Sequence, residues 1–326
     1  MNYENTKDAR VTSGVLHAVR KTLGILCALL MGLAWVILWS GCSRGPAAHA
    51  PKLREWRAWQ LPPEGPSLPT PRSLAVGLRD ELAVLDTAGR VTIYDSAGTL
   101  LRQWHMLDVS VGKPEGVTIL KDGRVVVCDT HYHRIVYFDS NGNWLRNFGS
   151  EGTGRGQFIF PVGICKDPDE NLYVCEYGGH DRVQKFTRDG EWLAEFGSFG
   201  TGSGQFQRPS GLAWLEKKIY VTDAINHRVL IFSDTGKFIQ NLGDPKPPQL
   251  YLPYDIALGP DGILNVIEYG AGRLSRFTPA GNLVAQFGES GQGTGQFATP
   301  WGLTVDSKGR IYVADTKNRR LVAFHF

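Results

Sequence analysis

The sequence has little excess of charge of either sign. Its 35 lysine and arginine residues nearly balance 32 aspartate and glutamate residues, for a formal net charge of +3. Four of these basic residues and two of the acidic ones precede Cys42, so 31 basic and 30 acidic residues remain from Cys42 onward. Nucleic-acid-binding proteins concentrate basic residues on one face. The balance gives no support for a nucleic-acid partner.

Cysteine is also scarce. Beyond the first 42 residues the cysteines are Cys128, Cys165 and Cys175, an odd number. If residues 167–171 form a hairpin turn, Cys165 faces Tyr173 on the next strand. In the same register Cys175 faces Gly163. No bridge between neighbouring strands follows, and buried small apolar thiols are the better interpretation.

Hydrophobic periodicity of the helical kind is missing from the body of the chain. Short apolar runs alternate there with turns, which leaves no room for long helices. The 39 glycines and 18 prolines suit a protein with many tight turns, and an aromatic content of 11% favours strands.

The N-terminus contains the long apolar run of the sequence. Residues 23–39 carry no polar side chain, and Arg10, Arg20 and Lys21 precede them. A basic start, an apolar middle and a small-residue end are typical of an export signal. The alternative is an uncleaved membrane helix, because residues 22–43 are free of charge and a span needs about 20 residues. Both interpretations place the rest of the protein outside the cytoplasm.

The ending Ser40-Gly41-Cys42 resembles a bacterial lipoprotein signal. That resemblance implies cleavage before Cys42 and lipid attachment to it, with Trp39 standing where such signals usually have leucine. We therefore divide the chain into a targeting segment at 1–41, an anchor cysteine with linker at 42–52, and a folded domain at 53–326. The N-terminal anchor makes the membrane an expected partner.

A repeat organises the folded domain. Each of six similar segments begins at a proline, and the spacings are 43, 47, 48, 44 and 47 residues. These prolines are Pro71, Pro114, Pro161, Pro209, Pro253 and Pro300. Within a segment, four short β-rich runs are separated by turns, as at Asp122-Gly123 or Asn141-Gly142. Four antiparallel strands in about 45 residues make one propeller blade, so the pattern predicts an all-β, six-bladed β-propeller.

The sixth segment stops at Phe326 after three strands. Fourth strands share a pattern of one apolar residue, two further residues and a large apolar residue, as in residues 145–148. Residues 53–56 fit this pattern. We expect this N-terminal strand to complete the last blade and so remove an exposed sheet edge.

The segments resemble NHL repeats. Residues 223–229 and 315–321 look like that family's acid-to-arginine loop, and residues 152–158, 200–206 and 291–297 look like its glycine loop. The resemblance covers residues 53–326 and implies the propeller fold. It implies no single function, because the family ranges from protein and RNA binding to metal-dependent lyases.

Each segment carries one acid and one arginine, and we expect each pair to tie two strand ends together by a charge-assisted bond. The pairs are Asp86/Arg90, Asp129/Arg134, Glu176/Arg182, Asp223/Arg228, Glu268/Arg273 and Asp315/Arg320. The glycine loops are expected to be turns between blades rather than phosphate-binding loops, because a strand and not a helix follows each.

The candidate ligand-binding site is the mouth of the central channel, where the innermost strands begin. Aromatic side chains lie there beside arginine and carboxylates, a mixture common at recognition surfaces. The candidate residues are Arg72, Glu115, Tyr177, Tyr254, Asp255, Tyr269 and Trp301. The resemblance to amidating lyases would place zinc-binding histidines at these strand starts, but none is histidine here. The sequence predicts no catalytic set, metal or cofactor.

Three functions remain open from the sequence. The leading one is a non-catalytic binding module that presents this face to a protein, peptide or glycan in the cell envelope. The alternative is a lactonase- or lyase-type enzyme with a divalent cation held by Glu115 and Asp255, since hard cations prefer oxygen ligands. The third is a purely structural envelope protein.

Overall fold

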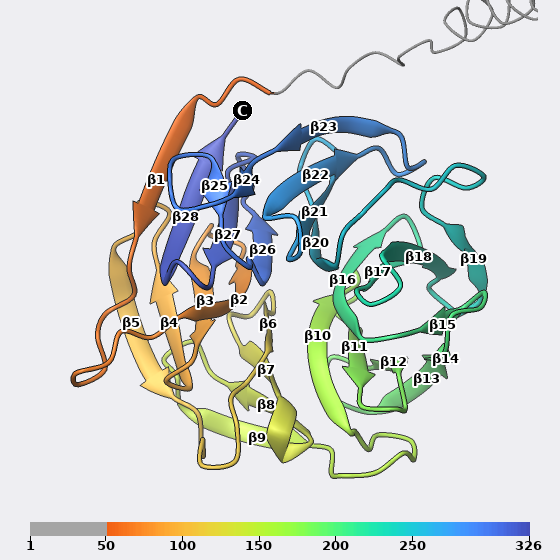
Figure 1. Ribbon diagram of the computed structural model, residues 1–326. Helices are drawn as coiled ribbons and strands as arrows, with labels where there is room; N and C mark the ends of the chain where they lie inside the picture. The colour runs from red at the N-terminus through yellow and green to blue at the C-terminus, as the bar shows by residue number, and fades with distance from the viewer. Residues whose placement is uncertain (1–50) are drawn as a thin grey trace, which may run out of the picture. The chain divides into compact units, whose positions relative to one another are not determined.

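The computed structural model describes residues 51–326, so the predicted targeting segment and Cys42 lie outside the described residues. The described chain forms a ring of six four-stranded antiparallel sheets (Figure 1). The prediction of an all-β, six-bladed propeller is confirmed. Between residues 51 and 326 the only helical element is the short 3₁₀ turn η1 (Thr130–Tyr132), and nothing there could cross a membrane as a helix.

In blades 1 to 5 the four strands follow one another in sequence from the channel outward, and in blade 6 the outermost strand is β1. Blade 1 contains β2 (Pro71–Val76), β3 (Leu82–Asp86), β4 (Arg90–Tyr94) and β5 (Leu100–His105). Blade 2 contains β6 (Gly116–Ile119), β7 (Val125–Asp129), β8 (Arg134–Phe138) and β9 (Trp144–Phe148). Blade 3 contains β10 (Phe160–Lys166), β11 (Leu172–Tyr177), β12 (Arg182–Phe186) and β13 (Trp192–Phe196). Blade 4 contains β16 (Pro209–Leu215), β17 (Lys218–Asp223), β18 (Arg228–Ser233) and β19 (Phe238–Asn241). Blade 5 contains β20 (Pro253–Leu258), β21 (Leu264–Glu268), β22 (Arg273–Phe277) and β23 (Leu283–Phe287). Blade 6 contains β26 (Gly302–Val305), β27 (Ile311–Asp315), β28 (Arg320–His325) and β1 (Glu55–Trp59). Two glycine loops form short parallel pairs, β14 (Ser198–Phe199) with β15 (Gln205–Phe206) and β24 (Glu289–Ser290) with β25 (Gln296–Phe297).

β1 lies beside β28, so the two ends of the described chain meet in one blade (Figure 1). Trp56 pairs with Phe324 in the antiparallel register, and the two rings stack with centroids 5.7 Å apart. The strand differs in bounds from the one expected at residues 53–56, because the pairing continues to Trp59 opposite Leu321.

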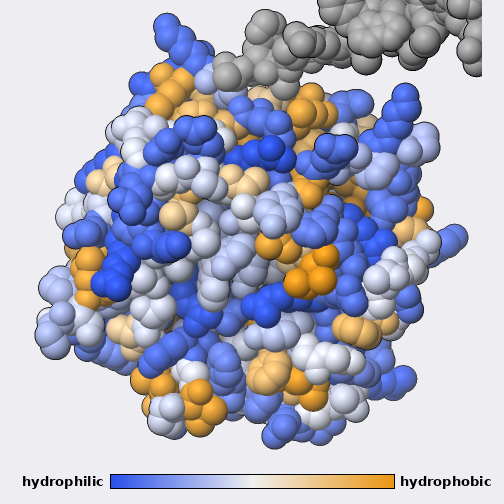
Figure 2. All heavy atoms as spheres, viewed as in Figure 1, coloured by the Kyte–Doolittle hydropathy of each residue, from blue (hydrophilic) through white to orange (hydrophobic). Residues whose placement is uncertain are grey.

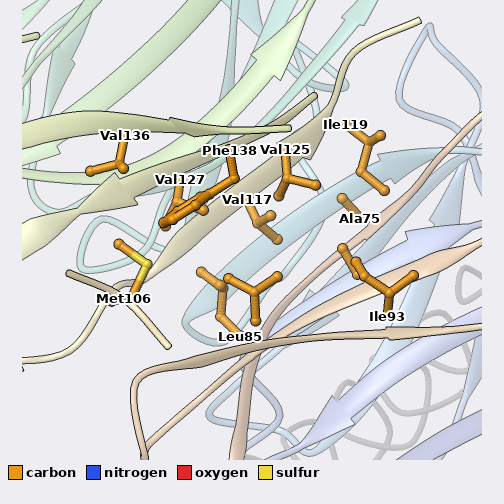
Figure 3. Packing of buried hydrophobic residues seen from close by; sticks show 12 residues of the cluster. Ala75, Leu85, Ile93, Met106, Val117, Ile119, Val125, Val127, Val136 and Phe138 are labelled. Carbon is orange, nitrogen blue, oxygen red and sulfur yellow. The ribbon is translucent and has the colours of Figure 1, made fainter. Parts of the chain in front are cut away.

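The core consists of six hydrophobic clusters, one between each pair of neighbouring blades. Successive side chains of a strand point to opposite faces of its sheet. In β3, Leu85 (Figure 3) and Ala83 pack toward blade 2, whereas Leu82 and Val84 pack toward blade 6. Because neighbouring blades cover both faces of the inner strands, these strands have continuous apolar sequences rather than alternating apolar and polar residues.

The outermost strands share the pattern of one apolar residue, two further residues and a large apolar residue, and only the large residue at its end is packed between blades. The large residue that closes it packs against the cluster between blades, as Phe148 and Trp104 do. The apolar residue that opens it is exposed, 45% for Leu145 and 51% for Leu101. Only the last residue of the pattern therefore predicts packing between blades.

The register expected for the blade 3 cysteines is confirmed. Cys165 pairs with Tyr173 and Cys175 with Gly163 across β10 and β11. Both thiols are free, as is that of Cys128. Burial raises the pKa of each of these three thiols, which suits inert packing groups.

All six predicted acid–arginine pairs form ion pairs. In blade 4, Arg228 Nε donates to Asp223 Oδ2 at 2.9 Å, while its Nη2 donates to the carbonyl oxygens of Gly202 and Gln205 in the glycine loop. The backbone N–H of Gln207 donates to Asp223 Oδ1. The other pairs are Asp86–Arg90, Asp129–Arg134, Glu176–Arg182, Glu268–Arg273 and Asp315–Arg320. Each pair joins β-strand ends, and in blade 4 it also fixes the loop from the preceding blade.

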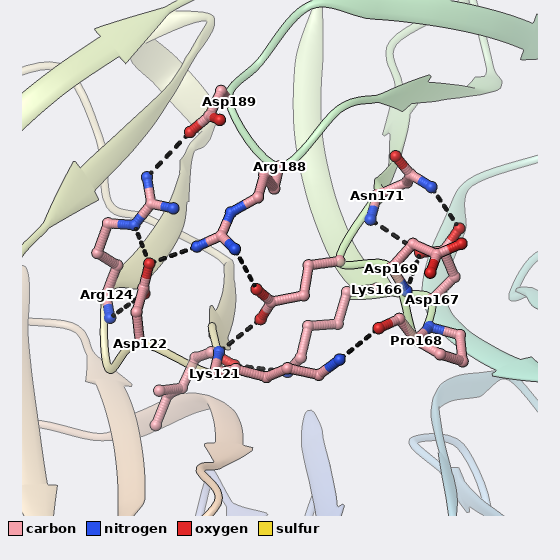
Figure 4. Close-up of polar contacts among 12 residues, drawn as sticks. Lys121, Asp122, Arg124, Lys166, Asp167, Pro168, Asp169, Asn171, Arg188 and Asp189 are labelled. Atoms are coloured by element: carbon pink, nitrogen blue, oxygen red, sulfur yellow. Dashed lines mark hydrogen bonds and ion pairs between the residues drawn. The ribbon is translucent and has the colours of Figure 1, made fainter.

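The hairpin face, opposite the channel mouth, carries a second set of ion pairs between blades 2 and 3 (Figure 4). Arg188 pairs with Asp122 and, at 3.0 Å, with the buried Glu170. Arg124 bridges Asp122 and Asp189. These hairpins therefore do more than turn the chain, because they link neighbouring blades.

We expect deletion of residues 1–60 to lower the melting temperature sharply relative to a chain that begins at Gly45. The deletion removes β1, exposes the edge of β28 and removes Trp56 and Trp59 from two inter-blade clusters. Loss of one fully buried tryptophan side chain costs about 3–5 kcal/mol, and because Trp56 and Trp59 are partly buried each should contribute less than that. Thermal unfolding followed by circular dichroism measures the difference; equal melting temperatures would show that β1 does not stabilise the ring.

Candidate functional site

Each of the six blades brings one side chain to the channel mouth, five of them from the start of the innermost strand. This channel-mouth ring consists of Arg72, Glu115, Tyr177, Arg208, Tyr254 and Trp301, from blades 1 to 6 in order. Each lies at the start of an innermost strand or, for Tyr177, at the adjoining end of β11. The convergence follows from the fold, because strands that begin at one end of a channel must place their first residues together.

Neighbouring members of the ring touch around most of its circumference. Arg72 Nη2 and Glu115 Oε1 form an ion pair at 2.6 Å, with side chains only 11% and 7% exposed. The Arg72 guanidinium also lies 4.4 Å from the centre of the Trp301 ring, and Trp301 stacks on Tyr254 with centroids 5.3 Å apart.

The ring continues through Arg208. Its Nη2 donates to the Tyr254 hydroxyl at 3.3 Å, and its guanidinium lies 4.4 Å from the centre of the Tyr177 ring. Burial is the main cause that raises the pKa of Tyr177 and Tyr254, so both hydroxyls stay protonated at neutral pH. The arrangement is a half-buried rim of three aromatic and three charged side chains.

Below the ring the channel contains a cavity of about 240 Å³. Asp255 lines its wall and accepts backbone N–H groups from Ile256 and Leu303, each at 2.8 Å. The carboxyl is reached only from this narrow channel. Burial raises its pKa to about 7 despite the two hydrogen bonds, which act in the opposite direction.

The predicted site residues thus fall into three positions. Arg72, Glu115, Tyr177, Tyr254 and Trp301 lie in the ring, and Asp255 lies below it. Tyr269 is behind the ring, with its centroid 5.8 Å from that of Tyr254.

Sequence reasoning missed Arg208. The candidates for the channel mouth were the residues that follow each repeated proline, whereas Arg208 precedes Pro209. Its φ of +63° turns it back toward the mouth, and its backbone N–H donates to Asp181. One feature of the sequence could have indicated Arg208. In the three repeats that contain a glycine loop, the residue before the first proline of the blade is Phe160 in blade 3, Arg208 in blade 4 and Thr299 in blade 6, so only blade 4 has a basic residue there.

The two carboxylates considered as ligands for a divalent cation both have other partners. Glu115 is engaged by Arg72, and the two oxygens of Asp255 each accept a backbone N–H. Within residues 51–326 no three histidine, cysteine, aspartate or glutamate side chains lie close enough to hold a metal ion. A hard cation prefers a cluster of oxygen ligands.

The loop histidines have packing roles. His131 and His133 both lie against the Phe160 ring at centroid distances of 5.7 Å. His227 stacks on Tyr251, and its Nδ1 accepts the backbone N–H of Leu252 at 3.0 Å.

Comparison with known proteins identifies the repeats. Residues 112–138 and 297–324 match the family model described as NHL repeat, and residues 200–245 match one described as 6-bladed beta-propeller. NHL repeat-containing protein 3 of Homo sapiens is 28% identical over 123 residues, which are 33% of this chain and 35% of that protein. The chain therefore contains NHL repeats, and its match spans about a third of that curated relative's length.

Solved structures share the fold. A gluconolactonase from Xanthomonas campestris has a TM-score of 0.61 at 17% identity, covering 86% of this chain and 93% of that one. A virginiamycin B lyase from Staphylococcus aureus has a TM-score of 0.60 at 15% identity, covering 83% and 99%. At these identities the likeness concerns the fold alone.

The Asp255 carboxyl should make stability depend on pH. Between its ordinary pKa of 3.8 and its raised value near 7, the folded chain keeps a proton that the unfolded chain has lost, so stability falls as pH rises. The amide of an Asp255→Asn variant carries no charge, and we expect this variant to gain stability relative to the native chain from pH 4 to 7, by at most about 1.4 kcal/mol per pH unit. Urea unfolding at several pH values measures this, with Asp261→Asn in an exposed hairpin as control. A constant difference would contradict the assignment.

Proposed function

We propose that this protein is a non-catalytic binding module of the cell envelope. The propeller is held at a membrane by a lipid on Cys42 and presents its channel-mouth ring to a protein, peptide or glycan partner outside the cytoplasm. The observation that carries the proposal is the ring itself, six side chains from six blades fixed by contacts among themselves.

The composition of the ring supports recognition. Tryptophan, tyrosine and arginine dominate the residues whose truncation most weakens protein interfaces, because they cover large areas with few rotamers and desolvate well. Here Trp301, Tyr254 and Arg72 are already immobilised by stacking, so binding would cost little side-chain entropy. Hydrophilic and hydrophobic side chains are intermixed on the face seen in Figure 2, which suits a partner held by specific contacts rather than by a large apolar patch.

The direction of β1 is consistent with a tether. The N–H of Arg54 donates to the carbonyl oxygen of His325, and the His325 ring contacts Lys308 in the blade 6 hairpin. Residue 51 therefore joins the propeller on the hairpin side, and the strand runs toward the channel-mouth side.

The alternative of a cation-dependent lactonase or lyase has less support. It shares the fold of the two enzymes above, but propellers carry unrelated activities. Its proposed ligands, Glu115 and Asp255, already have other partners.

Trp301→Ala should weaken partner binding by about 2 kcal/mol or more, roughly 30-fold, if Trp301 is an anchor. A pull-down from envelope extract, quantified against the native chain, measures retention, and Lys308→Ala on the hairpin face is the control. Lost partners at an unchanged melting temperature would support the site. A lower melting temperature with the same partners would mean that Trp301 only plugs the channel.

Cys42→Ala should abolish labelling by a fatty-acid analogue and leave a longer precursor, because cleavage and lipid attachment both require the cysteine. Gel migration and metabolic labelling provide the measurement. Cys27→Ala, within the apolar segment, is the matched control and should behave as the native chain does. Unchanged migration with retained membrane binding of Cys42→Ala would favour the uncleaved helix.

A further inference from the structure

The two arginines of the channel-mouth ring differ in their partners. Arg72 is neutralised by Glu115 at 2.6 Å. Arg208 has no carboxylate within ion-pair distance anywhere in residues 51–326, and the only acceptor recorded for its guanidinium is the Tyr254 hydroxyl. Arg72 and Glu115 are paired with each other, so Arg208 is the charged member of the ring that has no ion-pair partner among residues 51–326.

Arg208 is held in place from behind. Its backbone N–H donates to Asp181 Oδ2 at 2.6 Å, and Asp181, only 2% exposed, also accepts the N–H of Gly179. Pro209 follows and restricts the backbone further. The Asp181 carboxylate is therefore occupied by backbone groups and does not pair with the Arg208 guanidinium.

The guanidinium itself is fixed between two aromatic rings. Its carbon lies 4.4 Å from the centre of Tyr177 and 5.9 Å from that of Tyr254. Stacking restricts the orientation of the planar group and leaves donor N–H groups at its edge. An arginine with spare donors on a fixed plane matches a carboxylate, which it can bind with two parallel hydrogen bonds.

The groups beside Arg208 fit the same ligand. The Tyr254 hydroxyl accepts from Arg208 and still has its own proton to donate. Trp301 stacks on Tyr254 and carries the Arg72 guanidinium over its ring, so it lies one aromatic ring away from Arg208 along the rim. A peptide with an acidic side chain beside an aromatic or apolar one would satisfy both.

We propose that Arg208 is the specificity-determining residue of the channel mouth and selects a peptide segment that bears a carboxylate side chain. The proposal rests on the binding function proposed above. It adds the chemical class of the partner.

A random 12-residue phage-displayed peptide library tests this on the full-length chain, purified in detergent. Selected peptides should be enriched in aspartate or glutamate, and a synthetic selected peptide should lose at least tenfold in affinity when its acid is changed to the amide. This readout uses the native chain, so it does not depend on the folding of any variant.

The protein-side variants locate the effect. Arg208→Gln should remove the preference for the acidic peptide over its amide counterpart, and Arg208→Lys should restore part of it. Arg155→Gln is the matched control, since Arg155 also stacks on an aromatic ring, Trp192, but lies exposed in a glycine loop; it should leave the preference intact. Fluorescence anisotropy measures each affinity.

The failures are distinguishable. Peptides whose binding depends on Trp301 but shows no preference for acids would overturn the role of Arg208 and leave the binding function standing. Absence of any peptide that binds the native chain better than Trp301→Ala would overturn both for peptide partners. Retention of a polyuronate glycan with no peptide would show that the carboxylate comes from a saccharide and would overturn the peptide assignment.

Discussion

The ion pair between the end of the second strand and the start of the third is the constraint on which the propeller depends. Its acid is fully buried in blade 4, where Asp223 is 0% exposed, and the arginine extends from it to two carbonyl oxygens of the glycine loop. Burial raises the pKa of Asp223 even beside Arg228, so the desolvation cost is not fully offset by the pair. Such a pair contributes more to fixing one arrangement than to net stability. Removal of either partner would leave a buried charge or a set of unpaired carbonyl groups, at a cost of about 3–5 kcal/mol.

Because these ion pairs fix the position of each blade, the hydrophobic core lies in separate clusters between neighbouring blades. Each loop that the arginine holds leads into the next innermost strand, so the pair sets how one sheet meets its neighbour. Blade 2 shows what happens when the loop differs: Asp129 keeps its arginine, but its Oδ1 has no hydrogen-bond partner among the described residues. With every interface packed, including the one between blades 6 and 1, both faces of the inner strands are buried.

The channel mouth is a product of the same closure. Arg72 and Trp301 are separated by most of the chain, yet the guanidinium lies over the indole because blade 6 packs against blade 1. A chain of stacked and ion-paired groups then fixes side chains that would be mobile on an open surface. This pre-organisation supports the proposed binding function, because ordered side chains lose little entropy when a partner binds.

The sequence by itself determined the repeat, the number of blades, the acid–arginine pairs and the register of Cys165 and Cys175, because each depends on contacts within one blade or between a blade and its own entry loop. Turn residues and apolar runs specify such local pairings. Only the tertiary structure decided that Asp255 lies below the ring and that Arg208 turns toward the mouth. Those facts depend on how six sheets are angled around one axis and on one left-handed backbone conformation, and neither leaves a periodic mark in the sequence.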